Sequence, residues 1–467
     1  MRIKPVVVVG AGPVGLMCAL YLARVRKLPV IIVEQQPAVG GLYASVDTPW
    51  GCVDQGVHIP QETGVSVIDD LFFDVLSKNE WQMLDGVHKD IAGNIFAGQV
   101  DFGSLYPDLR RLPREDFLAS VAELFINLSP SYPDFNEAAD LREYFEARFG
   151  KFCTRTVFEP IAQKIWKQPL EKMSPWAAKL VHLARVVTHN QEAAVSLKMS
   201  PALNPVIGFP EQLAVPGEIF SNRRRAMYPK RFGLKWIVDG FVRELKREGV
   251  QLLTSSVIQR VDINAGVVSA IHLNVSKGSA LERKEVASVV WTSPLPHLMK
   301  LLDLAEMPMP DAPLPYRVVH LFLNQPPETG ALYWLWSYDA NDCLVRVSAP
   351  HAYCSDAVKN GVYPFCAEIQ VSDAGMDDSA AIALAESQLR MRGLIAQSTQ
   401  VLGGVVLGSI RSFFVPTIAN CQTMRSQRRT IESIRPANLL IATQDLNEGI
   451  FYMPDILCAA ISQLNDL

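Results

Sequence analysis

The hydrophobic pattern of the chain is clearest in its first forty residues. A run of four valines, Val6–Val9, is followed by a glycine-rich stretch at residues 10–15 and then by apolar residues at helical spacing as far as Ala23. A second apolar run, Val30–Val33, comes next. Uninterrupted β-branched runs of this length are typical of strands that are buried on both faces of a parallel sheet. The pattern therefore predicts a strand, a glycine-rich turn, a helix and a second, parallel strand.

The rest of the chain alternates between helical and strand patterns. Residues 114–187 are rich in helix formers with amphipathic spacing, and further helices are predicted at 235–248 and 454–464. Apolar and alternating runs predict strands at 249–253 and 255–258 as a pair, and at 267–273, 287–292, 318–323, 344–349, 364–371 and 438–445.

Composition and charge exclude several classes of protein. The chain has 467 residues, of which 49% are hydrophobic and 20% charged, so it is not intrinsically disordered. Its length predicts two or three structural units. The net charge of −4 is spread along the chain, which argues against nucleic acid as a partner.

The apolar stretch at residues 6–22 is the strongest candidate for a membrane segment, but three glycines and Pro13 interrupt it. We therefore predict neither a transmembrane helix nor a signal peptide. The eight cysteines form no C-x-x-C pair and no spacing suited to a metal. They predict reduced, mostly buried thiols in a cytoplasmic protein without a metal site.

The glycine-rich turn has the pattern G-x-G-x-x-G. In this pattern Gly10 permits a tight turn, Gly12 lets the backbone approach a pyrophosphate, and Gly15 lets the helix pack closely on the strand. The start of the helix offers free N–H groups and its positive dipole end to phosphates. Glu34 ends the second strand, where a carboxylate accepts hydrogen bonds from a ribose diol and disfavours the 2′-phosphate of NADP. This combination predicts a dinucleotide site, against the alternative of a βαβ unit that binds no nucleotide.

A Gly-Gly pair follows shortly after Glu34. With this pair, residues 34–42 resemble the amino-terminal signature of the FAD-binding family that includes amine oxidases, protoporphyrinogen oxidases, phytoene desaturases and UDP-galactopyranose mutases. The resemblance implies FAD rather than NAD as the cofactor. The cofactor-binding residues that it implies are Gly10, Gly12, Pro13, Val14, Gly15, Glu34, Gln35, Gly40, Gly41, Leu42, Val257, Asp445 and Met453.

Weaker resemblances to the same family occur further along the chain. Residues 54–58 are similar to a family strand that carries a histidine beside the flavin, which makes His58 a candidate catalytic residue against the alternative of an ordinary core histidine. Tyr452 is a second candidate. In relatives, the residue matching Val257 pairs with adenine through its backbone, and the acid matching Asp445 binds the ribityl chain. Here Gln444 replaces the usual glycine before that acid.

The resemblance implies an α/β fold with a Rossmann-like FAD-binding domain of the glutathione-reductase type, built on a parallel sheet. An interleaved α+β substrate domain with a helical part and an antiparallel sheet completes it. The expected FAD-binding domain is discontinuous, at residues 1–75, 228–295 and 416–467. The expected substrate domain comprises residues 76–227 and 296–415.

Three functions are compatible with these features. The first is an FAD-dependent oxidoreductase that oxidises a small organic substrate through the flavin. The second is a flavin-dependent sugar-nucleotide mutase without net redox change, and the third a flavin-free escort protein of the same fold. Arg223, Tyr228 and Arg231 form a candidate clamp for an anionic substrate, against the alternative of a solvated charged face. Neither the substrate nor the oligomeric state follows from the sequence.

Overall fold

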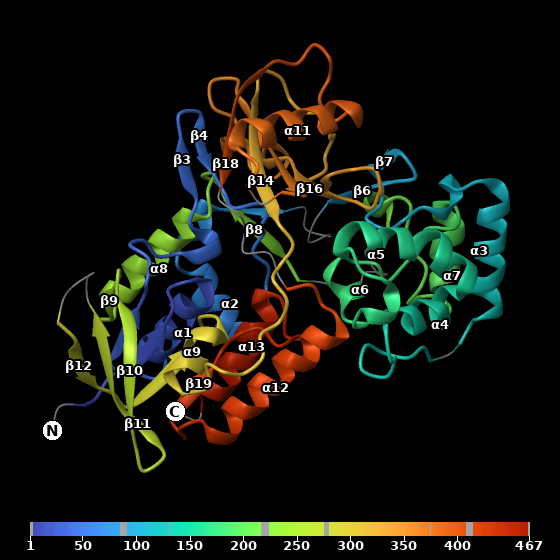
Figure 1. Ribbon diagram of the computed structural model, residues 1–467. Coiled ribbons are helices and arrows are strands. Elements are labelled where there is room, and N and C mark those ends of the chain that lie inside the picture. The colour runs from blue at the N-terminus through green and yellow to red at the C-terminus, as the bar shows by residue number, and fades with distance from the viewer. Residues whose placement is uncertain are drawn as a thin grey trace.

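The computed structural model describes residues 3–84, 91–129, 131–215, 224–274, 280–373, 375–407 and 414–465. It contains two large sheets, a smaller antiparallel sheet and a separate cluster of helices (Figure 1).

The amino-terminal strands lie in a five-stranded sheet with the order β19-β13-β1-β2-β9. All neighbouring strands in this sheet are parallel. The sheet confirms the parallel strands predicted from the valine-rich runs, and it brings the carboxyl ends of strands from distant parts of the chain to one edge. Its strands are β1 (Val6–Val9), β2 (Val30–Val33), β9 (Gln251–Leu253), β13 (Ser288–Trp291) and β19 (Leu439–Ile441).

Both faces of the parallel sheet are covered, which explains why its strands are apolar throughout. Val6 and Val8 share a core with the helices α1 (Pro13–Arg24), α2 (Ser66–Phe73), α8 (Lys235–Arg247) and α13 (Met453–Leu464). Val7 and Val9 point the other way, because successive side chains of a strand alternate between faces. They contact a core that includes the helices α9 (Leu295–Leu301) and α12 (Ile418–Ile434).

That second face also carries an antiparallel sheet of β10 (Val257–Asn264), β11 (Val267–Asn274) and β12 (Glu282–Glu285). The prediction that residues 249–253 and 255–258 pair with each other is wrong. β9 joins β2 in the parallel sheet, whereas β10 pairs with β11. The segment between β9 and β10 is bound to the end of β2 instead. The Ser256 N–H donates a hydrogen bond at 2.9 Å to the carbonyl of Glu34, the residue that follows β2.

The second large sheet has seven strands in the order β18-β14-β17-β16-β15-β6-β7. α11 (Asp378–Met391) packs on it at the top of Figure 1, and the short α10 (Pro350–Tyr353) also contacts it. The strands are β6 (Ala92–Phe96), β7 (Gln99–Asp101), β14 (Tyr316–Leu323), β15 (Trp334–Ser337), β16 (Leu344–Ser348), β17 (Tyr363–Gln370) and β18 (Val401–Leu407).

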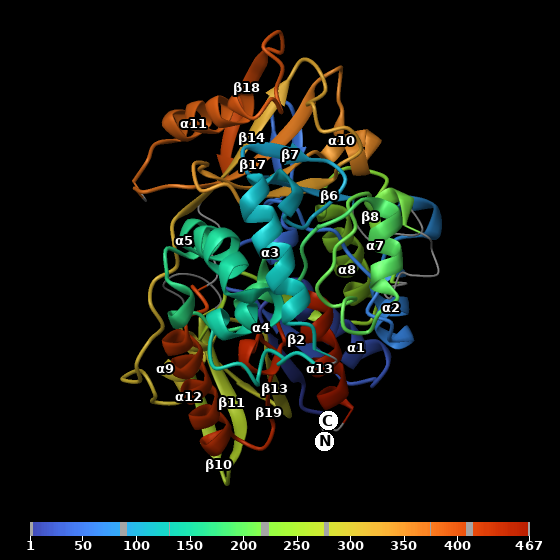
Figure 2. The same cartoon turned by 90° about the vertical axis from the view of Figure 1, so that its right-hand side faces the viewer.

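The predicted helical region forms a cluster on one side of the molecule, and this side faces the viewer in Figure 2. Its core includes the stacked rings of Phe145 and Phe158, whose centroids are 4.1 Å apart. The helices are α3 (Arg114–Ile126), α4 (Leu141–Cys153), α5 (Glu159–Trp166), α6 (Ala177–Leu180) and α7 (Gln191–Lys198). Two strand pairs complete the fold, β3 (Val46–Thr48) with β4 (Gly51–Val53) and β5 (Trp81–Leu84) with β8 (Ala226–Pro229).

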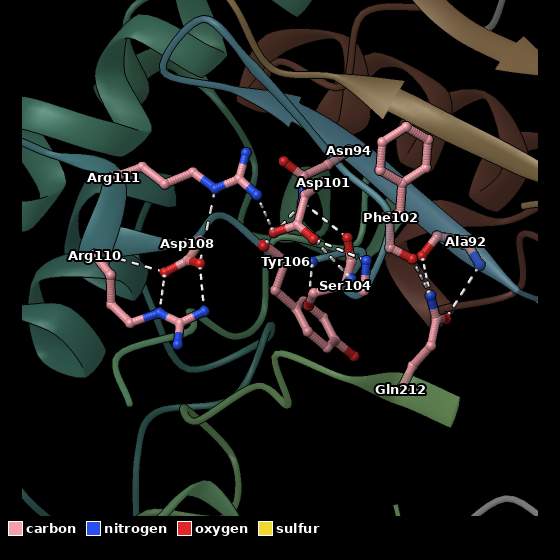
Figure 3. A network of polar contacts seen from close by, with 11 residues as sticks. Ala92, Asn94, Asp101, Phe102, Ser104, Tyr106, Asp108, Arg110, Arg111 and Gln212 are labelled. Atoms are coloured by element: carbon pink, nitrogen blue, oxygen red, sulfur yellow. Dashed lines mark hydrogen bonds and ion pairs between the residues drawn. The ribbon is translucent and has the colours of Figure 1, made fainter. Parts of the chain in front are cut away.

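A polar network joins the β6–β7 edge of the seven-stranded sheet to the helical cluster (Figure 3). The Arg111 guanidinium lies 3.2 Å from the Asp101 carboxylate, and Asp108 pairs with Arg110 at 2.7 Å. Asn94 is fully buried and donates to the carbonyls of Ser104 and Tyr106. These contacts fix the helical cluster to the sheet through charged and amide groups rather than through apolar packing alone.

The proposed division into a discontinuous FAD-binding domain and an interleaved substrate domain stays a prediction. The parallel sheet takes its strands from four separated parts of the chain, which is compatible with a discontinuous domain. Among the helices of the described ranges, none is both long and apolar enough to cross a membrane.

Candidate functional site

The glycine-rich turn lies at the carboxyl edge of the parallel sheet, between β1 and α1. Gly10 has a φ of +103°, a backbone conformation that favours glycine. A side chain at Gly15 would overlap the carbonyl oxygen of Gly10, so packing between turn and helix requires glycine there. Gly12 differs from both. Its φ of −73° suits any residue, and a Cβ atom there would meet no protein atom within 4 Å. The protein's own packing therefore gives no reason for glycine at position 12.

The first turn of α1 is suited to an anion. Pro13 is its first residue, Val14 follows, and the preceding Gly12 has no side chain with which to cap the helix. The turn contains no acidic residue, so neither a side chain nor a negative charge competes for its positive end. A phosphate group placed beside Gly12 would meet this end of the helix.

Glu34 is oriented by two backbone N–H groups. Its Oε2 accepts a hydrogen bond from the Ala11 N–H at 2.7 Å, and its Oε1 accepts one from the Gln36 N–H at 2.7 Å. The carboxylate is partly exposed. Each oxygen has lone pairs left, so Glu34 can accept further hydrogen bonds from the diol of a ribose.

The Gly-Gly pair folds back onto the glycine-rich turn. The Gly40 N–H donates to the Ala11 carbonyl at 2.8 Å, and a Cβ atom at Gly41 would lie 3.1 Å from the Cα of Gly12. Both Gly40 and Gly41 have positive φ angles, of 115° and 53°. Leu42 follows in a 3₁₀ turn and is exposed. We call residues 10–15, Glu34, Gly40 and Gly41 the nucleotide turn.

A pocket of about 260 Å³ opens beside the nucleotide turn. It brings together Gln35 and Val257, which are far apart in the sequence and were both predicted as cofactor-binding residues. His297 of α9 also lines it and was not predicted. The remaining lining residues are Val9, Val33, Ser256, Ile258, Ser293, Pro294 and Pro296.

On the opposite side of the Gly-Gly pair, Gln55 connects this pair to His58. The Gln55 side-chain amide donates to the carbonyls of Gly41 at 3.3 Å and Ala44 at 2.9 Å. Its backbone carbonyl lies 3.1 Å from His58 Nε2. Because a carbonyl can only accept, this contact places the ring hydrogen of His58 on Nε2 and leaves Nδ1 as an acceptor. Burial, together with the positive charge of Arg346, lowers the pKa of His58 to about 4.

Arg346 of β16 and Glu368 of β17 lie next to this loop. Their ion pair has an N···O distance of 2.6 Å, and a side chain at Gly56 would approach both of them. The Arg346 guanidinium lies 5.7 Å from the ring centroid of Trp336. Neither Arg346 nor Glu368 was predicted from the sequence. Each lies within a strand, without any motif that distinguishes it.

The start of α13 reaches the same place from the carboxyl end of the chain. Met453 Sδ accepts a hydrogen bond at 3.6 Å from the hydroxyl of Tyr43, which lies two residues after the Gly-Gly pair. The neighbouring Tyr452 lies parallel to the ring of His182, with centroids 6.4 Å apart, and burial raises its pKa to about 12. We call Gln55, Gly56, His58, Arg346, Glu368, Tyr452 and Met453 the His58 cluster.

Asp445 has contacts of its own in the protein. Its Oδ2 lies 3.0 Å from Nε of Arg428, and its Oδ1 accepts from the Asn447 N–H at 3.1 Å. The preceding Gln444, in the place of the expected glycine, donates to the Phe451 carbonyl at 3.1 Å. Contact between Asp445 and a ribityl chain stays a prediction, and the carboxylate has lone pairs left for it.

Arg223 of the predicted anion clamp lies outside the described residues. Arg225, two residues further along the chain, pairs with Glu62, whereas the exposed Arg231 beyond the other end of β8 stacks on the ring of Trp236 at 3.4 Å. No contact in the described part of the chain joins Arg225 to Arg231, and the clamp of Arg223, Tyr228 and Arg231 stays a prediction.

Tyr228, the third member of that clamp, is buried in a polar network. Its hydroxyl donates to the Asp54 carboxylate, which also accepts from Ser45 Oγ at 2.6 Å and from the Leu234 N–H at 3.0 Å. The carbonyl of Asp54 lies 2.9 Å from Nε2 of His320, and burial lowers the pKa of His320 to about 4. This network joins the segment after the Gly-Gly pair to β8, α8 and β14 and gives Tyr228 a structural role, whereas its contact with a substrate stays a prediction.

Comparison with known proteins places this geometry in context. Residues 8–71 match a family described as an NAD(P)-binding Rossmann-like domain. No curated protein matches the sequence. Among solved structures, reduced UDP-galactopyranose mutase superposes with a TM-score of 0.71 at 16% identity, over 99% of this chain and 95% of that chain. An Exiguobacterium sp. 255-15 protein whose name places it with the protoporphyrinogen oxidases gives a TM-score of 0.66 at 15% identity, over 100% and 99%.

Putrescine oxidase, in a structure with putrescine bound, superposes with a TM-score of 0.58 at 12% identity, over 99% of this chain and 98% of that chain. The chain shares the fold of these three proteins. The shared fold spans the full length of the chain rather than its Rossmann-like part alone. It confirms the predicted fold class and the resemblance drawn from residues 34–42.

Proposed function

We propose that the chain is an FAD-dependent oxidoreductase that oxidises a small organic substrate. The observation that carries the proposal is Gly12. Neither its backbone conformation nor its surroundings require glycine, and the open space beside it lies at the start of α1. A ligand that passes close to the backbone would explain the glycine at position 12, because any side chain there would collide with that ligand.

The nucleotide turn favours FAD over other dinucleotides. The carboxylate of Glu34 would repel the 2′-phosphate of NADP. The Gly-Gly pair lies against Gly12, and Gln55 connects Gly41 to His58, so a ligand that passes Gly12 and Gly41 would reach the His58 cluster. A dinucleotide with its adenine in the pocket of Gln35 and Val257 would direct its second half toward that cluster. A neutral, bulky ring system such as isoalloxazine matches this partly buried surrounding.

The His58 cluster would then hold the substrate. FAD supplies, when bound, a group that accepts two electrons from the substrate. His58 is neutral at pH 7, because its pKa is about 4, and its Nδ1 would accept a hydrogen bond from a substrate hydroxyl or amine. Arg346 and Glu368 present a cation and an anion at the same place, and Arg346 is the group that would orient an anionic substrate.

The first test is the absorption spectrum of the purified protein and of the protein reconstituted with FAD. Visible flavin bands with a stoichiometric, tightly held cofactor are expected. A colourless protein that fails to take up FAD would contradict the proposal and favour the flavin-free escort function. A second test separates the two enzyme functions. Bleaching of the flavin by small amines or hydroxy compounds without oxygen is expected for an oxidoreductase, whereas turnover of a sugar nucleotide by reduced protein without reoxidation would show a mutase.

A further inference from the structure

His297 is the one lining residue of the 260 Å³ pocket whose ring is fixed by the protein from two directions. Its Nε2 lies 3.0 Å from the Ile258 carbonyl oxygen. Its ring packs edge-to-face on the buried Trp291, with centroids 5.4 Å apart and planes at 68°. The hydrogen bond to Ile258 fixes which edge of the His297 ring faces β10, and the packing on Trp291 fixes the tilt of the ring.

The hydrogen bond to Ile258 also determines the tautomer of His297. A carbonyl oxygen can only accept, so the hydrogen of the neutral ring is on Nε2. Nδ1 is then an acceptor with no hydrogen to offer. It has no hydrogen-bond partner in the described part of the chain, and the side chain is partly exposed where it lines the pocket.

The other polar side chains of the pocket have no fixed polarity toward a ligand. Ser256 Oγ donates to the Thr254 carbonyl at 2.9 Å and Ser293 Oγ to the Val9 carbonyl at 3.4 Å, but either hydroxyl can rotate and donate elsewhere. Gln35 is exposed, and its amide can present either its oxygen or its nitrogen. A side chain that accepts and never donates can distinguish an amine from a carbonyl on a ligand of the same shape.

The pocket has the properties of a nucleobase site. Valine, isoleucine and proline side chains provide most of its lining, and it adjoins Glu34 through Gln35. We propose that His297 Nδ1 accepts a hydrogen bond from the exocyclic amine of adenine and makes the pocket selective for adenine over hypoxanthine. This inference rests on the proposed function, because the adenine belongs to the FAD that the nucleotide turn would hold.

Binding of ADP and IDP to the full-length, cofactor-free protein tests the inference without any enzymatic activity. The two ligands differ at neighbouring positions of the base: ADP carries an amine at C6 and a lone pair on N1, whereas IDP carries a carbonyl at C6 and a hydrogen on N1. The wild type is expected to bind ADP roughly 10-fold more tightly than IDP, because a lone pair that faces a carbonyl leaves both acceptors unsatisfied. In His297→Phe, which keeps a ring but loses Nδ1, the preference is expected to fall to about 2-fold or less, mainly through weaker ADP binding. His189→Phe makes the same replacement in the helical cluster and should leave the preference unchanged.

An unchanged ADP-to-IDP ratio in folded His297→Phe would overturn the inference and leave the proposed function standing. A wild type that binds neither FAD nor ADP would overturn both. If His297→Phe fails to fold, ¹⁵N NMR of the wild-type histidine rings decides instead. ADP should shift the Nδ1 resonance of His297 in the direction of an accepted hydrogen bond, and IDP should not. Equal shifts with both ligands would overturn the inference.

Discussion

The nucleotide turn and the His58 cluster lie next to each other, yet they are built in different ways. The nucleotide turn comes from residues 10–41, and backbone groups make most of its contacts, such as Gly40 to Ala11 at 2.8 Å. The His58 cluster draws on residues from Gln55 to Met453 and is held by side chains and charges, such as Arg346 with Glu368 at 2.6 Å. The nucleotide turn therefore depends on steric fit, and the His58 cluster depends on whether its polar groups have hydrogen-bond or ion-pair partners.

This difference has physical consequences. Steric overlap does not depend on pH or salt, so substitutions in the nucleotide turn should have the same effect under all conditions. Buried polar groups respond to protonation and to the loss of a single partner. Substitutions in the nucleotide turn should therefore act through steric overlap at any pH, whereas the polar groups of the other region should respond to pH and to the loss of a partner.

Gly15→Ala should have the largest effect. The added methyl group would overlap the carbonyl oxygen of Gly10, which is backbone and cannot rotate away. We expect the free energy of unfolding of the cofactor-free protein to fall by about 3 kcal/mol or more. Chemical denaturation followed by circular dichroism measures it. Gly12→Ala is the matched control, and a Gly15→Ala protein as stable as this control would contradict the steric account.

Gly12→Val should separate folding from cofactor binding. Because a Cβ atom at position 12 meets no protein atom within 4 Å, the stability of the cofactor-free protein should stay within about 0.5 kcal/mol of the wild type. FAD, however, would meet the new side chain, and its dissociation constant should rise roughly 10- to 100-fold. Quenching of FAD fluorescence on binding measures this constant. Normal FAD affinity in Gly12→Val would place the phosphates somewhere else.

The polar network behind the His58 cluster should respond to pH instead. Burial lowers the pKa of His320 to about 4, from an ordinary value of 6.5. Above pH 6.5 the ring is neutral in both the folded and the unfolded protein, so it does not change the free energy of unfolding with pH. Between pH 6.5 and 4 the unfolded chain binds a proton that the folded protein does not, so stability is lost as the pH falls. His320 alone should lower the free energy of unfolding by about 2 kcal/mol between pH 7 and pH 5.

His320→Gln isolates this contribution. Asp54 acts in the opposite direction, because burial raises its pKa, so the wild-type curve alone does not report on one residue. The difference between the wild type and His320→Gln should shrink by about 2 kcal/mol from pH 7 to pH 5. Denaturant titrations at both pH values, with FAD absent, give this difference. A constant difference would show that His320 is not held neutral by its surroundings.

The same contrast explains how much could be predicted from the sequence. The strands, the first helix, Glu34 and the Gly-Gly pair follow from local rules, because each residue's role depends on neighbours within a few turns of the chain. Arg346 and Glu368 could not be found in this way. They meet only because β16 and β17 are adjacent, and a charged residue inside a strand gives no sign of its partner.

Two further cases show what local patterns leave out. The basic cluster at 223–231 is compact in the sequence, but β8 separates Arg225 from Arg231, and Tyr228 between them points into the core. The Asp101–Arg111 pair of Figure 3 lies in a region without any motif, although it holds the helical cluster to the sheet. Sequence distance is a poor guide when strands and tertiary contacts decide which side chains meet.

Gln55 is the residue where the two regions are joined, and it gives the smallest but most specific prediction. Its amide donates to the carbonyls of Gly41 and Ala44, while its own carbonyl binds His58. Gln55→Glu keeps the shape of the side chain but turns two donated hydrogen bonds into contacts between acceptors. We expect FAD affinity to fall roughly 10-fold, since each lost hydrogen-bond partner costs about 1 kcal/mol.

The comparison of three variants shows whether donors or shape hold the Gly-Gly pair. Gln99→Glu adds the same charge on the exposed β7 and should leave FAD affinity unchanged. Gln55→Ala removes the donors without adding acceptors, so its affinity should lie between the wild type and Gln55→Glu. FAD titrations of all three give the ranking. If Gln55→Glu bound FAD as the wild type does, the nucleotide turn would be independent of the His58 cluster, and a cofactor bound to one would have no influence on the position of His58 in the other.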